Sequence, residues 1–242
     1  MRSYEKAEFY LKPAEMKQSS GFLFRQKSNH TVDRLLLVKE MVIMKILLDI
    51  GHGGSKKSTG GKVIRDFGAV SQSYKTDEFH WNENFVKNYL IPEFQRNNLE
   101  YEIVLRKTGT EELVSDLNKA SKTGDIILSF HLNSDIKASG TEVLYWETSV
   151  NGKKLAGLLQ KKLTEVLKLP DRGIKGRRKP LNSKDALNQR GWTMFKNTKV
   201  PFVMMESFFI TNNIDMETGN KNIAAMAKAV TEAVLEFREG RK

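Results

Sequence analysis

The sequence predicts an α/β fold: a single domain built on a mainly parallel central sheet with helices on both faces. Short apolar runs of strand length alternate along the chain with longer segments whose apolar residues recur at helical spacing. Strands that alternate with helices form βαβ units, in which the strands run parallel. The 242 residues suit one such domain, with room for an appendage but not for two full domains.

The first predicted strand is residues 45–50, KILLDI, and it leads directly into the glycine-flanked histidine of residues 51–54, GHGG. A short apolar run bounded by glycine is typical of a strand that is buried on both faces. In open α/β sheets, ligands bind beyond the carboxyl ends of the strands. We therefore expect His52 to lie where it can reach a metal or a substrate.

The rest of the chain continues the alternation. Residues 53–73 are predicted to be a loop, and residues 76–97 a helix that Thr76 or Asp77 caps. The other predicted strands are 101–106, 125–130, 140–146 and 200–205, and the other predicted helices are 110–121, 152–169 and 220–239. Residues 171–190 are rich in lysine and arginine and are predicted to be a basic loop.

The composition excludes several classes of site. Cysteine is absent, which rules out disulfides, thiolate ligands and a cysteine nucleophile and leaves His, Asp and Glu as metal ligands. The net charge of +11 favours an anionic partner such as nucleic acid, anionic lipid or a bacterial wall polymer. No run approaches the roughly 18 apolar residues that span a bilayer, so no transmembrane segment is expected, and no signal peptide is visible.

Residues 1–43 differ from the remainder because they are polar and irregular, and we expect them to be an N-terminal extension of a domain at 44–242. Met41 and Met44 are each a natural start for that domain. Lys39 and Glu40 can be encoded by codons that resemble a bacterial ribosome-binding sequence, so the extension need not belong to the native protein. The nucleotide sequence would decide this.

Four residues form the candidate site. Three predicted strands deliver His52, His131 and Glu206 to one edge of the sheet, and Glu78 lies on the inward face of the helix at 76–97. Two imidazoles and a carboxylate are a recurrent ligand set for catalytic zinc, Zn2+, which keeps a fourth position for water. The remaining carboxylate would then be the acid and base. Glu83 is the rival of Glu78 as third ligand.

Seven motifs then resemble one family, the zinc-dependent N-acetylmuramoyl-L-alanine amidases (amidase type 3 catalytic domain). They are DIGHGG (49–54), GAV (68–70), Glu78 with Asn82, SFHLN (129–133), GTEV (140–143), RGIK (172–175) and VPFVMMESFFITN (200–212). The resemblance implies cleavage of the amide between N-acetylmuramic acid and L-alanine in peptidoglycan. It also implies that His52, Glu78 and His131 bind zinc and that Glu206 is catalytic. The chain departs from the family at Asp116, where members often carry an arginine.

The resemblance makes the anionic partner peptidoglycan of the bacterial cell wall, and nucleic acid is not expected. With no signal peptide, we expect a protein made in the cytoplasm that acts on the wall after release, as a phage or prophage lysin does, or an extracellular one. Two alternatives remain open. One is a zinc peptidase that cuts within wall peptides, and the other is a non-catalytic protein that binds a polyanion (wall polymer or nucleic acid) on this scaffold.

Overall fold

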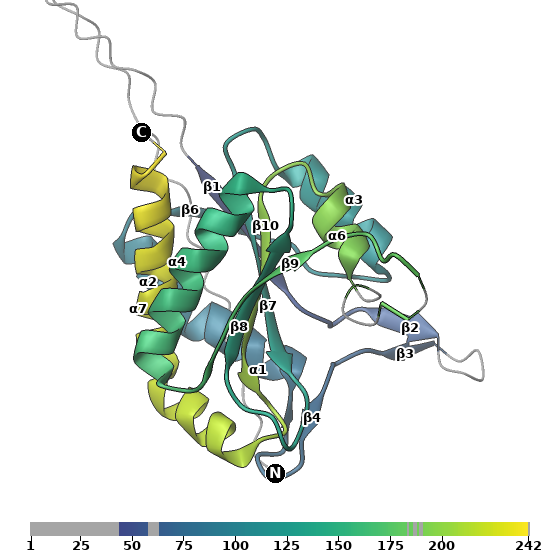
Figure 1. Ribbon diagram of the computed structural model, residues 1–242, viewed down its shortest axis with the longest axis vertical. Helices are drawn as coiled ribbons and strands as arrows, with labels where there is room; N and C mark the ends of the chain where they lie inside the picture. The colour runs from purple at the N-terminus through teal and green to yellow at the C-terminus, as the bar shows by residue number, and fades with distance from the viewer. Residues whose placement is uncertain (1–43, 58–62, 183, 186–187, 189–190, 242) are drawn as a thin grey trace, which may run out of the picture. The chain divides into compact units, whose positions relative to one another are not determined.

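The computed structural model describes residues 44–57, 63–182, 184–185, 188 and 191–241, and it confirms the predicted α/β fold class (Figure 1). Within these residues the central sheet has six strands in the order β6-β1-β7-β10-β8-β9. Their bounds are Lys45–Ile50 (β1), Glu100–Ile103 (β6), Ile126–Asn133 (β7), Thr141–Trp146 (β8), Asp171–Arg177 (β9) and Phe202–Phe209 (β10). The predicted extension, residues 1–43, lies outside the described residues.

The sheet is mainly parallel, as predicted. Strands β6, β1, β7 and β10 run in one direction. Strand β8 is antiparallel to β10, and β9 is parallel to β8, so the last two strands run the other way. The carboxyl ends of β1, β7 and β10 therefore lie at one edge, where His52, His131 and Glu206 were expected.

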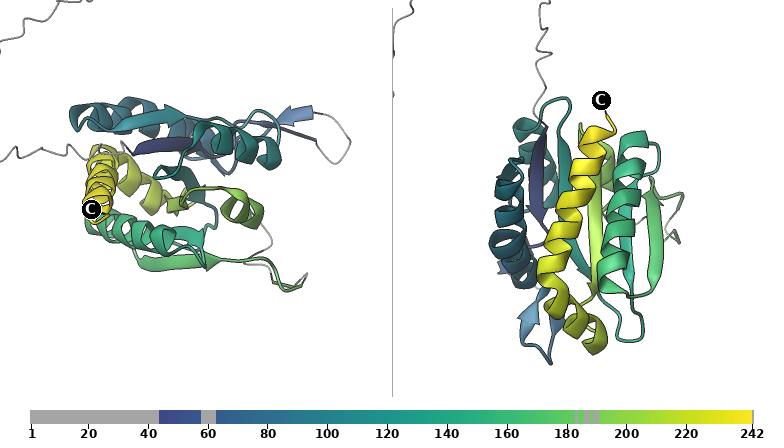
Figure 2. Two further views of the ribbon diagram at one scale, coloured as in Figure 1. Left: turned by 90° about the horizontal axis from the view of Figure 1, so that it is seen from above. Right: turned by 90° about the vertical axis from the view of Figure 1, so that its left-hand side faces the viewer.

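Helices cover both faces of the sheet (Figure 2). One face packs against α1 (Glu78–Phe85), the π-helical turn η1 (Val86–Leu90), α2 (Ile91–Arg96), α4 (Val150–Leu167) and α7 (Asn213–Glu239). The other face packs against α3 (Thr110–Ala120) and α6 (Trp192–Asn197). Among the described helices, none combines the length and apolar character needed to cross a membrane.

The strands divide their side chains between two cores by simple alternation. Leu47, Ile127 and Met204 pack on the side of α3 and α6. Their immediate neighbours along the strands, such as Leu48 and Leu128, pack on the side of α1, α4 and α7. Asp49 and Glu206 lie two positions beyond Leu47 and Met204 on the same strands, and both line the same cavity as Met204.

Two segments predicted as loops contain strands. Residues 53–73 hold the hairpin of β2 (Ser55–Lys57) and β3 (Val63–Arg65) and also β4 (Val70–Ser71), which pairs with β5 (Thr76–Asp77). The predicted basic loop at 171–190 begins with β9, and residues 183, 186–187 and 189–190 of it lie outside the described part. β9 is an edge strand, and charged residues are common on such strands, so it lacks the apolar run that would have revealed it.

The helices also differ from prediction at three places. The helix predicted at 76–97 runs from Glu78 to Arg96, because Thr76 and Asp77 form β5, and the turn η1 interrupts its α-helical hydrogen bonding. Helix α6 was not predicted. Helix α7 begins at Asn213 rather than at 220. Gly219 therefore lies inside the helix, where any side chain would overlap the ring of Phe208. Glycine normally weakens a helix, so sequence reasoning placed the start after it.

Candidate metal centre and active site

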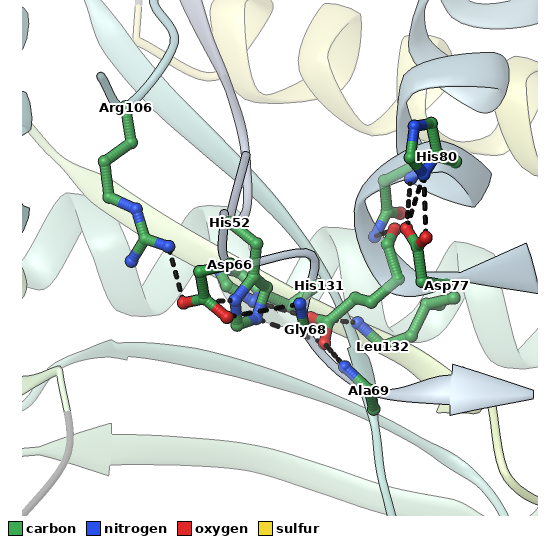
Figure 3. Close-up of polar contacts among 11 residues, drawn as sticks. His52, Asp66, Gly68, Ala69, Asp77, His80, Arg106, His131 and Leu132 are labelled. Atoms are coloured by element: carbon green, nitrogen blue, oxygen red, sulfur yellow. Dashed lines mark hydrogen bonds and ion pairs between the residues drawn. The ribbon is translucent and has the colours of Figure 1, made fainter. Parts of the chain in front are cut away.

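Three predicted ligands converge at the carboxyl edge of the sheet (Figure 3). His52 follows β1, Glu78 is the first residue of α1, and His131 lies within β7 rather than after it. Glu78 Oε1 is 2.8 Å from His131 Nδ1, and Glu78 Oε2 is 3.1 Å from His52 Nε2. One ligand atom from each residue lies within 4.8 Å of the others. The set is therefore compact enough to bind one metal ion.

Glu78 is held in place by the start of its helix. Asp77 caps α1 by accepting a hydrogen bond from the His80 backbone N–H, and the helix dipole favours an anion at this end. Glu78 is only 4% exposed, and its side-chain oxygens accept hydrogen bonds from the backbone N–H groups of Leu132 (3.1 Å) and Ala69 (3.2 Å). These backbone hydrogen bonds help to hold the carboxylate towards the two histidines.

Burial and charge set the protonation of this cluster. Burial alone would raise the pKa of Glu78, but the hydrogen bonds and charges of His131 and His52 outweigh it and hold that pKa well below its usual range. Burial alone would lower the pKa of His131, but its contact with Glu78, together with the charges of Glu206 and Asp49, raises it to about 9. The metal-free cluster therefore holds a proton where a cation would bind.

His52 itself has an unusual backbone. Its φ is 68°, in the left-handed region that non-glycine residues rarely adopt. Gly51, just before it, cannot be replaced without cost, because a side chain there would overlap the ring of His131. A glycine before His52 is thus explained by the close approach of β1 and β7 at the site. The positive φ of His52 is a backbone strain, and such strain is common at functional sites.

Sequence reasoning missed a charged pair behind His52. Asp66 Oδ2 lies 3.1 Å from His52 Nδ1, and Arg106 Nη2 donates a 2.7 Å hydrogen bond to the same Asp66 oxygen (Figure 3). A carboxylate behind a ligating histidine fixes its tautomer and ring orientation. The sequence feature that could have pointed to Asp66 is its position two residues before the glycine of the GAV motif.

Glu206 lies inside β10, not at its end as predicted, and its Cα is paired with His131 on one side and Glu142 on the other. Burial raises the pKa of Glu206 to about 8; the charge of His131 opposes this shift, and the carboxylates of Glu78 and Glu142 add to it. Its Oε2 atom is buried and has no hydrogen-bond partner among the described residues. Such a carboxyl group is available for proton transfer.

The GTEV and RGIK motifs meet beside Glu206. Arg172 Nε donates a 2.9 Å hydrogen bond to Glu142, whose other oxygen accepts one of 3.0 Å from Asn133. This network ties β8, β9 and β7 together next to the site. Arg172, Glu142 and Asn133 therefore connect three strands next to the site.

Asp49 on β1 and Ser129 on β7 form a buried pair beside the site. Ser129 donates a 2.6 Å hydrogen bond to Asp49 Oδ2, and burial raises the pKa of Asp49 against the opposing effects of His131, Ser129, Arg106 and His52. Asp49 was visible in the sequence as the single acid of an apolar strand.

A cavity of about 770 Å³ opens above these groups, between the sheet edge and helices α3 and α6. We refer to it as the site cavity. His52, Glu78, His131 and Glu206 all line it, together with Arg106. The rival ligand Glu83 does not: it forms an ion pair of 2.6 Å with Lys87 one turn further along the same helical segment. The remaining described histidine, His80, is exposed and contacts Asp77, the cap of its own helix.

Comparison with known proteins identifies the family. The family model for N-acetylmuramoyl-L-alanine amidase matches residues 46–236. The chain belongs to the N-acetylmuramoyl-L-alanine amidase family. A relative within it, the N-acetylmuramoyl-L-alanine amidase LytC of Bacillus subtilis (strain 168), is 35% identical over 104 residues. That match covers 41% of this chain and only 18% of the length of LytC.

Solved structures of amidase catalytic domains share the fold of this family member. The catalytic domain of CD27L endolysin targeting Clostridia Difficile has a TM-score of 0.61 at 22% identity and covers 80% of this chain and 97% of its own. The N-acetylmuramoyl-L-alanine amidase from Clostridium difficile 630 has a TM-score of 0.62 at 20% identity, with 82% and 98% covered. At these identities the similarity establishes the fold alone.

Proposed function

We propose that this protein is a zinc-dependent N-acetylmuramoyl-L-alanine amidase that hydrolyses the amide between N-acetylmuramic acid and L-alanine in peptidoglycan. The observation that carries the proposal is the convergence of His52, Glu78 and His131 beside Glu206 in one cavity. Family membership supports the bond that is cut. The convergence of these side chains supports metal-assisted hydrolysis as the type of reaction.

The residues present fit a zinc ion. Two imidazole nitrogens and one carboxylate are a common protein ligand set for catalytic zinc, and their atoms already lie within 4.8 Å of one another. We propose His52, Glu78 and His131 as the ligands, with Asp66 orienting His52. Zinc in such a site supplies an acidic water and a Lewis acid for the substrate carbonyl.

We propose Glu206 as the general acid and base. A carboxyl group with a pKa near neutral can accept a proton from the attacking water and then donate it to the departing nitrogen of L-alanine. Its unpartnered Oε2 atom is free for this exchange within the described residues, and its strand register holds it next to His131. The apolar residues of the cavity, such as Leu144 and Met204, limit the access of other water molecules.

Peptidoglycan lies outside the cytoplasmic membrane, so we propose that the enzyme acts on the wall after release or export, as a phage or prophage lysin does. The net charge of +11 would favour an anionic wall electrostatically, with affinity that falls as salt rises. Adding the purified protein to bacterial cells from outside tests this. Lysis of walls of at least one type supports the proposal, and activity on no intact wall contradicts it.

Zymography on several wall types, with and without a chelator, tests the metal-dependent hydrolysis. We expect clearing that is lost with the chelator and returns with zinc. Clearing that persists after complete metal removal, with no zinc in the protein, would overturn the zinc mechanism. Persistent binding without clearing on every wall type would favour the non-catalytic alternative.

A further inference from the structure

A second cavity, of about 390 Å³, lies beside the site cavity. Along one segment, residues 68–69 line the site cavity and residues 70–73 line the second one. Along another segment, residues 133–134 line the site cavity and Ile136 lines the second. The two cavities therefore adjoin at the carboxyl edge of the sheet, and we call the second one the side groove.

The side groove is uncharged although the protein is not. Charged residues make up 29% of the sequence, but none lines this groove in the described part of the chain. Its lining consists of serine, threonine, asparagine and glutamine residues together with Val70 and Ile136. Asp135 and Lys137 flank Ile136 in the sequence and do not line the groove.

Apolar side chains are exposed along the side groove. Val70 is 47% exposed and Ile136 is 73% exposed. Tyr74, 39% exposed, donates a 3.5 Å hydrogen bond from its hydroxyl group to the carbonyl oxygen of Asn213, a residue that lines the groove. Exposed apolar and aromatic groups among amides and hydroxyls suit a ligand that has apolar faces and many uncharged polar groups.

Thr211 offers an unused polar atom in the side groove. Its Oγ1 is buried and makes no hydrogen bond with any residue that the structure describes. A buried hydroxyl group without a partner costs free energy, and a ligand hydroxyl or amide could satisfy it.

An arginine lies on the far side of the candidate metal centre from the side groove. Arg106 lines the site cavity, where its guanidinium group forms an ion pair with Asp66. Figure 3 shows Arg106 and Ala69 on opposite sides of His52 and His131, and Ala69 directly precedes the residues that line the side groove. The candidate metal centre therefore lies between Arg106, with its partner Asp66, and a groove that no charged residue of the described chain lines.

This asymmetry matches the two parts of the substrate. The stem peptide of peptidoglycan carries carboxylates, which arginine side chains attract. The glycan strand consists of N-acetylated sugars with hydroxyl and amide groups, and its muramic acid carboxyl is neutral while it is joined to the peptide. We propose that the side groove binds the uncharged glycan strand next to the muramic acid whose amide is cut, so that the stem peptide lies on the arginine side. This inference rests on the proposed amidase function.

The test uses the full chain loaded with zinc and an uncharged probe, the tetramer of N-acetylglucosamine. We expect the probe to shift the NMR signals of Val70 and Ile136. Ile136→Glu and Thr211→Val should each weaken its binding about tenfold, the size expected for one lost buried contact. Val150→Glu is the matched control, because Val150 is 83% exposed on α4 and lines a different cavity. On polymeric peptidoglycan, Ile136→Glu should raise KM and leave kcat unchanged.

The inference fails if the sugar leaves the signals of Val70 and Ile136 unmoved, if Ile136→Glu binds the probe as wild type does, or if a sugar-free stem peptide shifts those signals instead. The two proposals fail separately. Sugar binding in the side groove without cleavage of any muramoyl–alanine bond would overturn the amidase function and support the groove. Cleavage without sugar binding would overturn the groove alone.

Discussion

Glu206 and His131 are direct cross-strand neighbours, with their Cα positions paired in the parallel ladder of β10 and β7. Because side chains alternate along a strand, a slip of one residue in this register would move Glu206 to the opposite face of the sheet. Hydrogen bonding between the two strands therefore fixes how close the proposed acid and base lies to a proposed ligand. The position of Glu206 relative to His131 is therefore set by the pairing of the two strands.

The first prediction concerns Glu206. Replacing it with glutamine removes proton transfer but leaves the three proposed ligands intact, so we expect the rate to fall by about two to four powers of ten while zinc content is unchanged. The rate of release of soluble fragments from peptidoglycan and metal analysis of the purified variant check this. A variant that keeps at least a tenth of the activity would remove Glu206 from its proposed role.

The second prediction separates Glu78 from Glu83. Glu78→Gln should lose zinc and activity together, because it removes a charged ligand that contacts both histidines. Glu83→Gln is the matched control on the same helical segment, where it only loses an exposed ion pair with Lys87. Zinc content and activity of both variants are measured side by side. The reverse pattern would make Glu83 the ligand.

The third prediction concerns the residues behind His52. Asp66→Asn should weaken zinc binding about 10- to 100-fold, the range seen when a carboxylate behind a ligating histidine is lost. Competition with a coloured chelator measures the affinity directly, without reference to activity. Asp116→Asn is the control, because Asp116 pairs only with Lys107 and Lys119 among the ion pairs of the described surface. Equal affinities for the Asp66→Asn variant and wild type would contradict the role assigned to Asp66.

The fourth prediction is a pH dependence of stability in the metal-free protein. The folded state raises the pKa of His131 from 6.5 to about 9, so the folded protein holds a proton that the unfolded chain has released between these values. Its contribution to the free energy of unfolding is complete below pH 6.5 and is lost as the pH rises towards 9. Glu206, raised from 4.5 to about 8, acts in the same direction.

The thermal midpoint Tm of the metal-free protein should therefore fall between pH 6 and pH 9. Zinc should raise Tm more at pH 9 than at pH 6, because metal binding competes with the proton on His131. Differential scanning calorimetry with and without zinc at several pH values measures both effects. A metal-free Tm that rises with pH, or a zinc effect that shrinks, would show that the cluster does not hold the proton assigned to it.

Much of the fold could be predicted because the buried strands carry a strong signal. β1 and β7 contain apolar runs, and the histidines that follow these runs in the sequence stand out against them. Edge strand β9 escaped prediction because its exposed, charged residues resemble a loop. The start of α7 escaped because Gly219 is favoured there only by the packing of Phe208, which no local pattern reveals.

The same distinction holds at the site. His52, His131 and Glu206 were predicted from strand topology, and Glu78 from the inward face of a helix. The pair of Asp66 and Arg106 was missed because these residues are 40 positions apart and meet only after the segment behind His52 folds against the end of β6. Contacts of this kind depend on tertiary structure and leave no periodic signal in the sequence.

Mass spectrometry of the products from purified peptidoglycan tests the central claim most directly. Digestion with the zinc-loaded protein should yield stem peptides with a free L-alanine amino terminus and glycan strands with intact muramic acid, and Glu206→Gln should yield neither at a comparable rate. New ends within the stem peptide, with the muramoyl–alanine bond uncut, would contradict the account and identify the enzyme as a peptidase.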